Sequence, residues 1–135
     1  MIRSVSAIVA AVLVWFAVAT VGNLAVRVMI PGYTAVEAAM NFTPPMQIAR
    51  LTVGLLSSLC AGAACAAIAR SGRLPAWIAA SLMVLLFLPV HYSVWEKFPV
   101  WYHAFFLITL APAVLLGAAI WASRGRGRRA SPPGA

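Results

Sequence analysis

The sequence predicts an all-α integral membrane protein whose four transmembrane helices form an antiparallel bundle. Of its 135 residues, 64% are hydrophobic and 9% are charged, whereas soluble domains are about 45–50% apolar and about 25% charged. Four apolar stretches are present, each close to the roughly 20 residues that a helix needs to cross a hydrocarbon layer of roughly 30 Å. Because a soluble fold of this size cannot hide so much apolar surface, we expect lipid to be the solvent.

The predicted spans cover residues 5–26, 47–69, 76–92 and 101–122, so that residues 1–123 form one transmembrane domain. The first span has an alternative interpretation as a secretory signal peptide, because Arg3 precedes it and residues 17–19 read Ala-Val-Ala, the shape of a cleavage site. The apolar run continues past this site, which favours a retained helix. Residues 124–135 are rich in arginine, glycine and proline and are predicted to form a basic disordered cytoplasmic tail.

The basic residues predict how the helices are oriented. Lys and Arg collect in the cytoplasmic loops of membrane proteins. We therefore expect the net charge of +8 to reflect membrane topology and not nucleic-acid binding. One side of the predicted bundle carries Arg27, Arg50 and Lys97. The other side carries seven basic residues: Arg3, Arg70, Arg73, Arg124, Arg126, Arg128 and Arg129. Both termini are therefore predicted to be cytoplasmic, in a bacterial inner membrane.

A stripe of small side chains runs along the second span. Gly54, Ser58, Gly62 and Ala66 recur every four residues and so lie on one face of a helix. Small residues let two helices approach closely, which is how helices associate in lipid, where hydrophobicity no longer drives them together. We expect this stripe to pack against other helices of the bundle. The alternative is an interface with a second copy of the chain or with another membrane protein.

Four polar residues are predicted to meet at the outer ends of the first two spans. Asn23 lies near the outer end of the first span, Glu37 lies in the following loop, and Gln47 and Arg50 lie at the start of the second span. A hydrogen-bonded cluster of these residues would satisfy their polar groups and hold the helix ends together. We expect a structural role, with ligand binding as the alternative.

Two histidines occupy opposite ends of the outer hairpin between the third and fourth spans. His91 and His103 are expected at similar depth and close together, with Glu96 between them in sequence. Two histidines and a carboxylate are able to bind a transition metal, and two histidines can ligate haem iron. The spacing matches no compact metal motif, so we expect hydrogen-bonding residues in an aromatic interfacial belt, and no metal or other cofactor.

Residues that usually serve catalysis or coupled transport are missing from the middle of the predicted spans. Ionisable groups at membrane depth are costly and usually functional, and none lies there. Small multidrug exporters are similar in size and span number but carry a glutamate within the first span. This sequence has Val12, Leu13 and Val14 at that depth. We therefore expect a non-enzymatic accessory or structural protein that acts through helix packing. The alternatives are a subunit of a small oligomeric transporter or channel, and a metal- or haem-binding redox module at the outer face.

The first half of the chain resembles a group of small four-helix membrane proteins of bacteria. The resemblance is carried by an asparagine near the outer end of the first span, a loop with tyrosine and glutamate, and a Pro-Met entry into a second span rich in small residues. The matching residues are Asn23, Tyr33, Glu37, Pro45 and Met46. A basic residue expected before the proline is replaced by Thr43-Pro44. The resemblance implies an inner-membrane location and no established activity.

Overall fold

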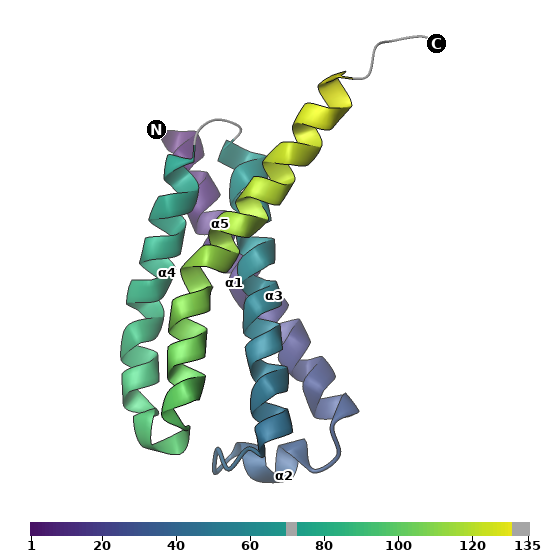
Figure 1. The fold of residues 1–135 in the computed structure, drawn as a ribbon, viewed down its shortest axis with the longest axis vertical. Helices are drawn as coiled ribbons and strands as arrows, with labels where there is room; N and C mark the ends of the chain where they lie inside the picture. Colours follow the sequence, from purple (N-terminus) through teal and green to yellow (C-terminus); the bar gives the residue numbers. More distant parts are fainter. Residues whose placement is uncertain (70–72, 131–135) are drawn as a thin grey trace.

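A computed structural model describes the backbone of residues 1–69 and 73–130 and the side chains of residues 1–69 and 73–125. This part of the chain is helical and contains no strand (Figure 1). The long helices are joined by short segments, one of which contains a five-residue helix and another a 3-10 turn. In chain order the elements are α1 (Ile2–Met29), α2 (Tyr33–Glu37), α3 (Pro44–Ala69), α4 (Leu74–Ser93), η1 (Trp95–Lys97) and α5 (Val100–Ala130).

Four of these helices are long and apolar enough to cross a membrane, which confirms a multi-pass architecture by length and composition. Each helix extends beyond its predicted span, because hydropathy marks only the apolar part of a helix. The real ends follow local backbone chemistry instead. α1 stops just before Pro31 and Gly32, whose φ of 77° suits glycine. α3 starts at Pro44, where a missing N–H costs nothing in the first turn.

The predicted disordered tail is wrong for the part of it that is described, because α5 continues as a helix to Ala130. Arginine is a good helix former, and adding residues to an existing helix is far easier than starting one. Residues 124–130 therefore continue the helix beyond the predicted fourth span, despite Gly125 and Gly127. The last five residues of the predicted tail lie outside the described residues.

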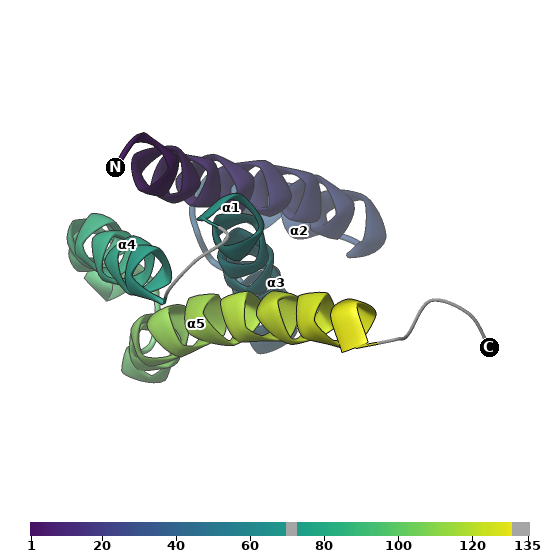
Figure 2. The ribbon, with the colours of Figure 1, turned by 90° about the horizontal axis from the view of Figure 1, so that it is seen from above.

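Helix α3 lies at the centre of the arrangement. α3 makes its most extensive contacts with α5 and with α1, whereas α4 packs mainly on α5. Viewed from above, α3 stands between α1 and α5, with α4 to one side (Figure 2). α2 and η1 lie at the same end of the molecule (Figure 1), where Phe42 and Phe98 stack with ring centroids 5.9 Å apart. We call this the α2 end.

Two glycines allow α3 and α5 to touch backbone to backbone. A methyl group on Gly62 would overlap the carbonyl of Val114, and a methyl group on Gly117 would overlap the carbonyl of Leu59. The contact is therefore reciprocal, with one glycine on each helix. Pro112 lies inside α5 just before this crossing, and α5 changes direction near its middle (Figure 1). A proline removes one helical hydrogen bond and bends the helix at that point.

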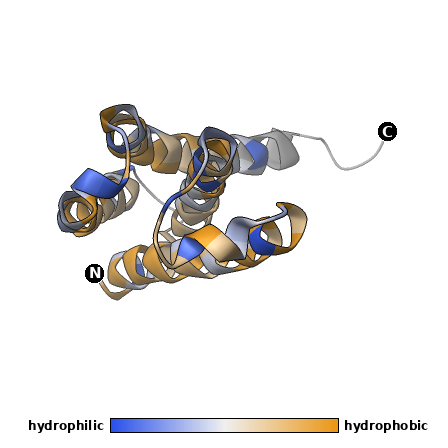
Figure 3. Cartoon of the chain, turned by 90° about the horizontal axis from the view of Figure 1, so that it is seen from below, coloured by the Kyte–Doolittle hydropathy of each residue, from blue (hydrophilic) through white to orange (hydrophobic). Residues whose placement is uncertain are grey.

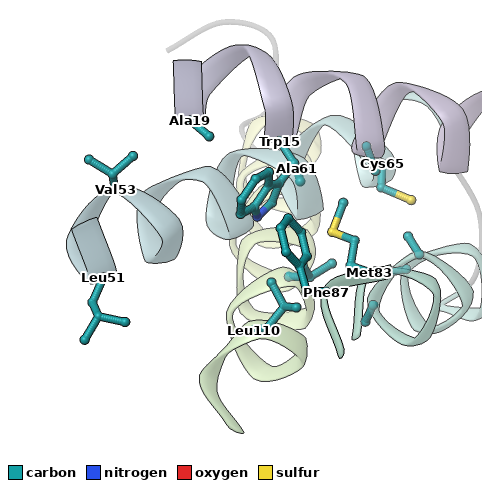
Figure 4. Close-up of a cluster of buried hydrophobic side chains, with 14 of the residues drawn as sticks. Trp15, Ala19, Leu51, Val53, Ala61, Cys65, Met83, Phe87 and Leu110 are labelled. Atoms are coloured by element: carbon teal, nitrogen blue, oxygen red, sulfur yellow. The ribbon is translucent and has the colours of Figure 1, made fainter. Parts of the chain in front are cut away.

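Aromatic side chains fill the middle of the bundle. Trp15 of α1 and Phe87 of α4 face each other with ring centroids 4.4 Å apart (Figure 4). Trp15 is buried, and its indole N–H donates to Ser58 Oγ of α3 over 3.0 Å. Ser58 in turn donates to the carbonyl of Gly54. The ring is thus fixed in the core with its polar atom satisfied, as a buried tryptophan requires.

The outer surface of the helices is apolar. Large hydrophobic side chains on α1, α4 and α5 are exposed, among them Leu13, Leu85 and Ile108. Figure 3 shows hydrophobic residues along the helices and hydrophilic residues in the segments that join them. Such a distribution suits helices that face hydrocarbon, with their connections at the membrane surfaces.

Candidate functional site

A partly open cavity of about 210 Å³ lies between the long helices, towards the α2 end. A cavity of roughly 150 Å³ holds one benzene molecule, and pockets for drug-sized ligands measure about 300–1,000 Å³. The space therefore suits one six-membered ring or a group of similar bulk. Most of its walls are aromatic or aliphatic. The lining residues that bear on its chemistry are Trp15, Asn23, Arg50, Phe87, His91 and Tyr102.

Arg50 brings a positive charge to this cavity. It lies in the second turn of α3, where its Nη1 donates to the hydroxyl of Tyr33 over 2.7 Å. Its guanidinium carbon also lies 4.7 Å from the centroid of the Phe42 ring, in a cation–π contact. The Nε atom is buried and has no hydrogen-bond partner. Arg50 is thus held by Tyr33 and Phe42, and Tyr102 also interacts with its guanidinium, while its Nε donor stays unused.

No carboxylate partners Arg50 in the described part of the chain. The protein has two acidic residues. Glu37 binds Arg27, with 2.9 Å between its Oε2 and the arginine Nε, and Glu96 lies exposed in η1. The groups that contact Arg50 are Tyr33, Phe42 and Tyr102, and none of them is a carboxylate.

The predicted polar cluster is not one network. Asn23 donates to the carbonyl of Ala19 in its own helix, over 2.8 Å. Gln47 donates to the carbonyl of Phe42 over 3.1 Å, and its Oε1 is buried without a partner. Both side chains therefore donate to backbone carbonyls close by in sequence, as polar side chains often do, and not to each other.

The two charged members of the predicted cluster also have partners that differ from the prediction. Glu37 pairs with Arg27 at the end of α1, and Arg50 pairs with Tyr33. α2 turns its first residue, Tyr33, into the core, where it is fully buried, and leaves Glu37 at the surface beside α1. Of the four predicted residues, the structure brings only Asn23 and Arg50 to the same cavity.

His91 and His103 meet directly, as their places at the two ends of the hairpin predicted. Their Nδ1 atoms lie 2.8 Å apart, within hydrogen-bond distance. His103 is 1% exposed and His91 is 6% exposed, so both side chains are buried within the protein, near the end of α4 and the start of α5. Trp95 stacks on His103, with ring centroids 4.6 Å apart. Only His91 lines the cavity.

The metal and haem alternatives gain no support from this geometry. Glu96 is exposed whereas both histidines are buried, and the described residues contain no group of three or more potential metal ligands. The two Nδ1 atoms contact each other, and a cavity of single-ring size has no room for a haem between them. The residues present therefore do not fit a haem.

The stripe of small residues is covered by other helices of the same chain. Gly62 contacts the backbone of α5, and Gly54 lies against the ring of Phe106. Ser58 accepts the indole N–H of Trp15, and Ala66 is half-buried. Three of the four positions thus pack inside the bundle, where they are not accessible to a second copy.

Sequence reasoning assigned no site role to Trp15, Tyr33 or Tyr102, which shape the site. A usable signal existed for Trp15, because tryptophan favours the membrane interface and this one lies in the middle of a span. A tryptophan there needs a partner for its N–H. No comparable signal marks Tyr33, because its burial depends on how α2 turns.

Comparisons with known proteins give no further guide to the site: no family model, curated protein or solved structure matches this chain.

Proposed function

We propose that this chain is a non-enzymatic, multi-pass protein of a bacterial inner membrane that binds a small anionic molecule with a single ring in its cavity. Its four spans form an antiparallel bundle with both termini in the cytoplasm, so the cavity faces the outer side. The distribution of basic residues supports this orientation. One observation carries the proposed function: Arg50 lines the cavity and has no carboxylate partner among the described residues.

The charge of Arg50 favours an anionic ligand. A cation removed from water is costly unless an anion or several hydrogen bonds compensate it. Tyr33 supplies one hydrogen bond, Phe42 one cation–π contact and Tyr102 a further polar contact, and the buried Nε has no acceptor. A carboxylate reaching the guanidinium would form charge-assisted hydrogen bonds, roughly twice as strong as neutral ones. An anion completes this site better than a neutral group does.

The walls of the cavity favour a ring over a simple inorganic anion. Trp15, Phe87 and Phe106 all contribute to the lining, and Trp15 contacts both of the others through its ring. The indole N–H is used by Ser58, so Trp15 offers the cavity an apolar ring. Aromatic ligands pack well against such rings. An aromatic monocarboxylate, of which benzoate is the simplest, combines both features.

The roles expected from sequence are less well supported. The stripe that suggested action through helix packing contacts α1 and α5 of the same chain, so an accessory role would need another surface. A shared transport pore would need polar side chains on a lipid-facing surface, and the exposed side chains in the spans are mainly apolar. The occupancy of the cavity by a ligand therefore remains the better proposal.

The proposal is tested by titrating benzoate and benzyl alcohol into the protein in nanodiscs of zwitterionic lipid, followed by calorimetry. We expect saturable binding of benzoate and much weaker binding of the neutral alcohol. Arg50→Met should weaken benzoate binding at least tenfold, because it keeps the length of the side chain and removes the charge. Arg27→Met is the matched control, since Arg27 does not line the cavity.

Two results would contradict the proposal. One is equal benzoate affinity in the Arg50→Met and Arg27→Met variants. The other is a cavity already filled by a phospholipid, seen as one tightly bound lipid per chain in native mass spectrometry that Arg50→Met removes. In that case Arg50 binds a lipid phosphate and the protein has no small-molecule ligand at this site.

A further inference from the structure

We infer that the ligand of this cavity carries a hydroxyl group in addition to its anionic group, and that this hydroxyl donates a hydrogen bond to Nε2 of His91. This inference rests on the proposed function and narrows its ligand to a hydroxylated aromatic anion. It is carried by the contact between His91 and His103, whose hydrogen-bond directions are fixed by a third atom, the carbonyl oxygen of Trp95.

The first step assigns the proton on His103. Its Nε2 lies 3.3 Å from the carbonyl oxygen of Trp95. A carbonyl oxygen only accepts hydrogen bonds, so Nε2 of His103 carries the proton and donates. In a neutral imidazole one nitrogen is protonated and the other is not. The Nδ1 of a neutral His103 is therefore an acceptor.

The second step assigns the proton on His91. The two Nδ1 atoms are 2.8 Å apart, and a hydrogen bond of this length needs one proton between them. Because His103 Nδ1 accepts, His91 Nδ1 donates. A neutral His91 then has no proton on Nε2. Its ring thus presents a bare acceptor nitrogen on the edge opposite His103.

The third step concerns charge. The pair would take up another proton only by placing a positive charge in the interior, where His91 is 6% and His103 is 1% exposed. A buried charge is costly without a counter-charge, and both acidic side chains are elsewhere, Glu37 on Arg27 and Glu96 at the surface. Arg50, which also lines the cavity, is a cation and supplies no counter-charge. These surroundings offer no counter-charge to a proton added to the pair.

The last step concerns the donor for Nε2 of His91. None of the hydrogen bonds among the described residues uses Nε2 of His91. Of the neighbouring donors, Trp15 is committed to Ser58 and Asn23 to its own helix. Tyr102 interacts with Arg50, and its ring lies nearly parallel to that of His91, with the ring centroids 6.1 Å apart. Because His91 lines the cavity, an occupant that carries a hydroxyl group would supply a donor for Nε2.

Together these steps define a ligand with two polar ends and an aromatic body. Its carboxylate accepts from Arg50, and its hydroxyl donates to His91 Nε2. Trp15 and Phe87 contact the ring between them. Hydroxybenzoates are the simplest compounds of this class, and both the meta and para isomers are suitable probes.

The test compares 3- and 4-hydroxybenzoate with their methyl ethers, using the wild-type protein in nanodiscs. A methyl ether keeps the ring, the carboxylate and the oxygen but has no proton to donate. An acceptor left unpaired in a buried site lowers affinity by about tenfold. We expect at least one hydroxybenzoate to bind about ten times more tightly than its ether. In a His91→Phe variant the hydroxybenzoate and its ether should bind equally.

Nitrogen NMR of the histidine-labelled protein supplies an independent check that needs no variant. We expect His91 to be protonated at Nδ1 and His103 at Nε2, and His91 Nε2 to shift when hydroxybenzoate is added. Benzoate binding with equal affinities for hydroxybenzoates and ethers would overturn this inference and leave the proposed function intact. The opposite tautomer at His91 would also overturn it. A failure of all these anions to bind would remove the proposed function and this inference together.

Discussion

The indole N–H of Trp15 in α1 donates to the hydroxyl of Ser58 in α3 over a distance of 3.0 Å, between two side chains that are both buried. This bond joins two helices in the middle of the bundle. Ser58 also donates to the carbonyl of Gly54 in its own helix. One hydroxyl thus satisfies an interhelical donor and an intrahelical acceptor.

Replacing Ser58 with alanine should destabilise the protein by about 1 kcal/mol, because the indole N–H loses its acceptor. Interhelical hydrogen bonds in membrane proteins contribute about 0.6 kcal/mol on average and up to about 1.7. The control is Ser57→Ala, since Ser57 is equally buried but bonds only within its own helix. Reversible unfolding in mixed micelles measures both. Equal losses in the two variants would mean that the Trp15 bond has no separate effect.

Adding one methyl group at Gly62 should separate α3 from α5. Gly62→Ala places its Cβ on the carbonyl of Val114, and overpacking of this kind costs about 1–3 kcal/mol. The control is Gly125→Ala, because Gly125 has open space around it and alanine favours a helix by about 1 kcal/mol over glycine. We expect a lower melting temperature for Gly62→Ala alone, with self-association unchanged.

The same experiment tests whether the contact of Gly62 and Gly117 between α3 and α5, here called the glycine seam, lies within one chain. If Gly62→Ala shifted the oligomeric state while leaving the melting temperature unchanged, the seam would be an interface between copies of the chain. Cross-linking in detergent at several protein concentrations distinguishes the two outcomes.

Reporter fusions should place both ends of the chain in the cytoplasm. Fusions after Arg73 and at the C-terminus are expected to read cytoplasmic, and fusions near Glu37 and Lys97 to read external, because the basic residues are asymmetric. An external C-terminus would contradict the four-span orientation. It would indicate that the first segment is cleaved or that one helix does not cross.

Metal analysis of the purified protein should find no metal ion bound in proportion to the chain. The histidine pair is hydrogen-bonded internally and has no carboxylate beside it, which leaves too few ligands for a stable site. A double variant, His91→Ala with His103→Ala, should still insert into the membrane. A metal that co-purifies with the wild type and is lost from this variant would show that the pair is a ligand set.

Hydropathy predicted the four long helices because their apolar runs are continuous, but it could not place their ends. The helix in residues 124–130 was missed because a composition rich in arginine and glycine resembles a disordered tail, and the preceding span nucleates it. The contact between His91 and His103 follows from a hairpin, which brings its two ends together whatever its sequence. The pairing of Arg50 with Tyr33 instead of Glu37 depends on how the five residues of α2 turn. No periodicity in the sequence records that turn.

The most direct test of the proposed site measures whether a bound carboxylate touches Arg50. Solid-state NMR of the protein labelled with nitrogen-15 at arginine, with benzoate labelled at its carboxyl carbon, reports this distance. We predict dipolar dephasing that corresponds to a guanidinium nitrogen within about 4 Å of the carboxyl carbon, as in an ion pair. The Arg50→Lys variant, which has no guanidinium at this position, should lose the dephasing. Bound benzoate with no dephasing in the wild-type protein, or with the same dephasing in Arg50→Lys, would contradict the assignment of Arg50 as the anion-binding residue.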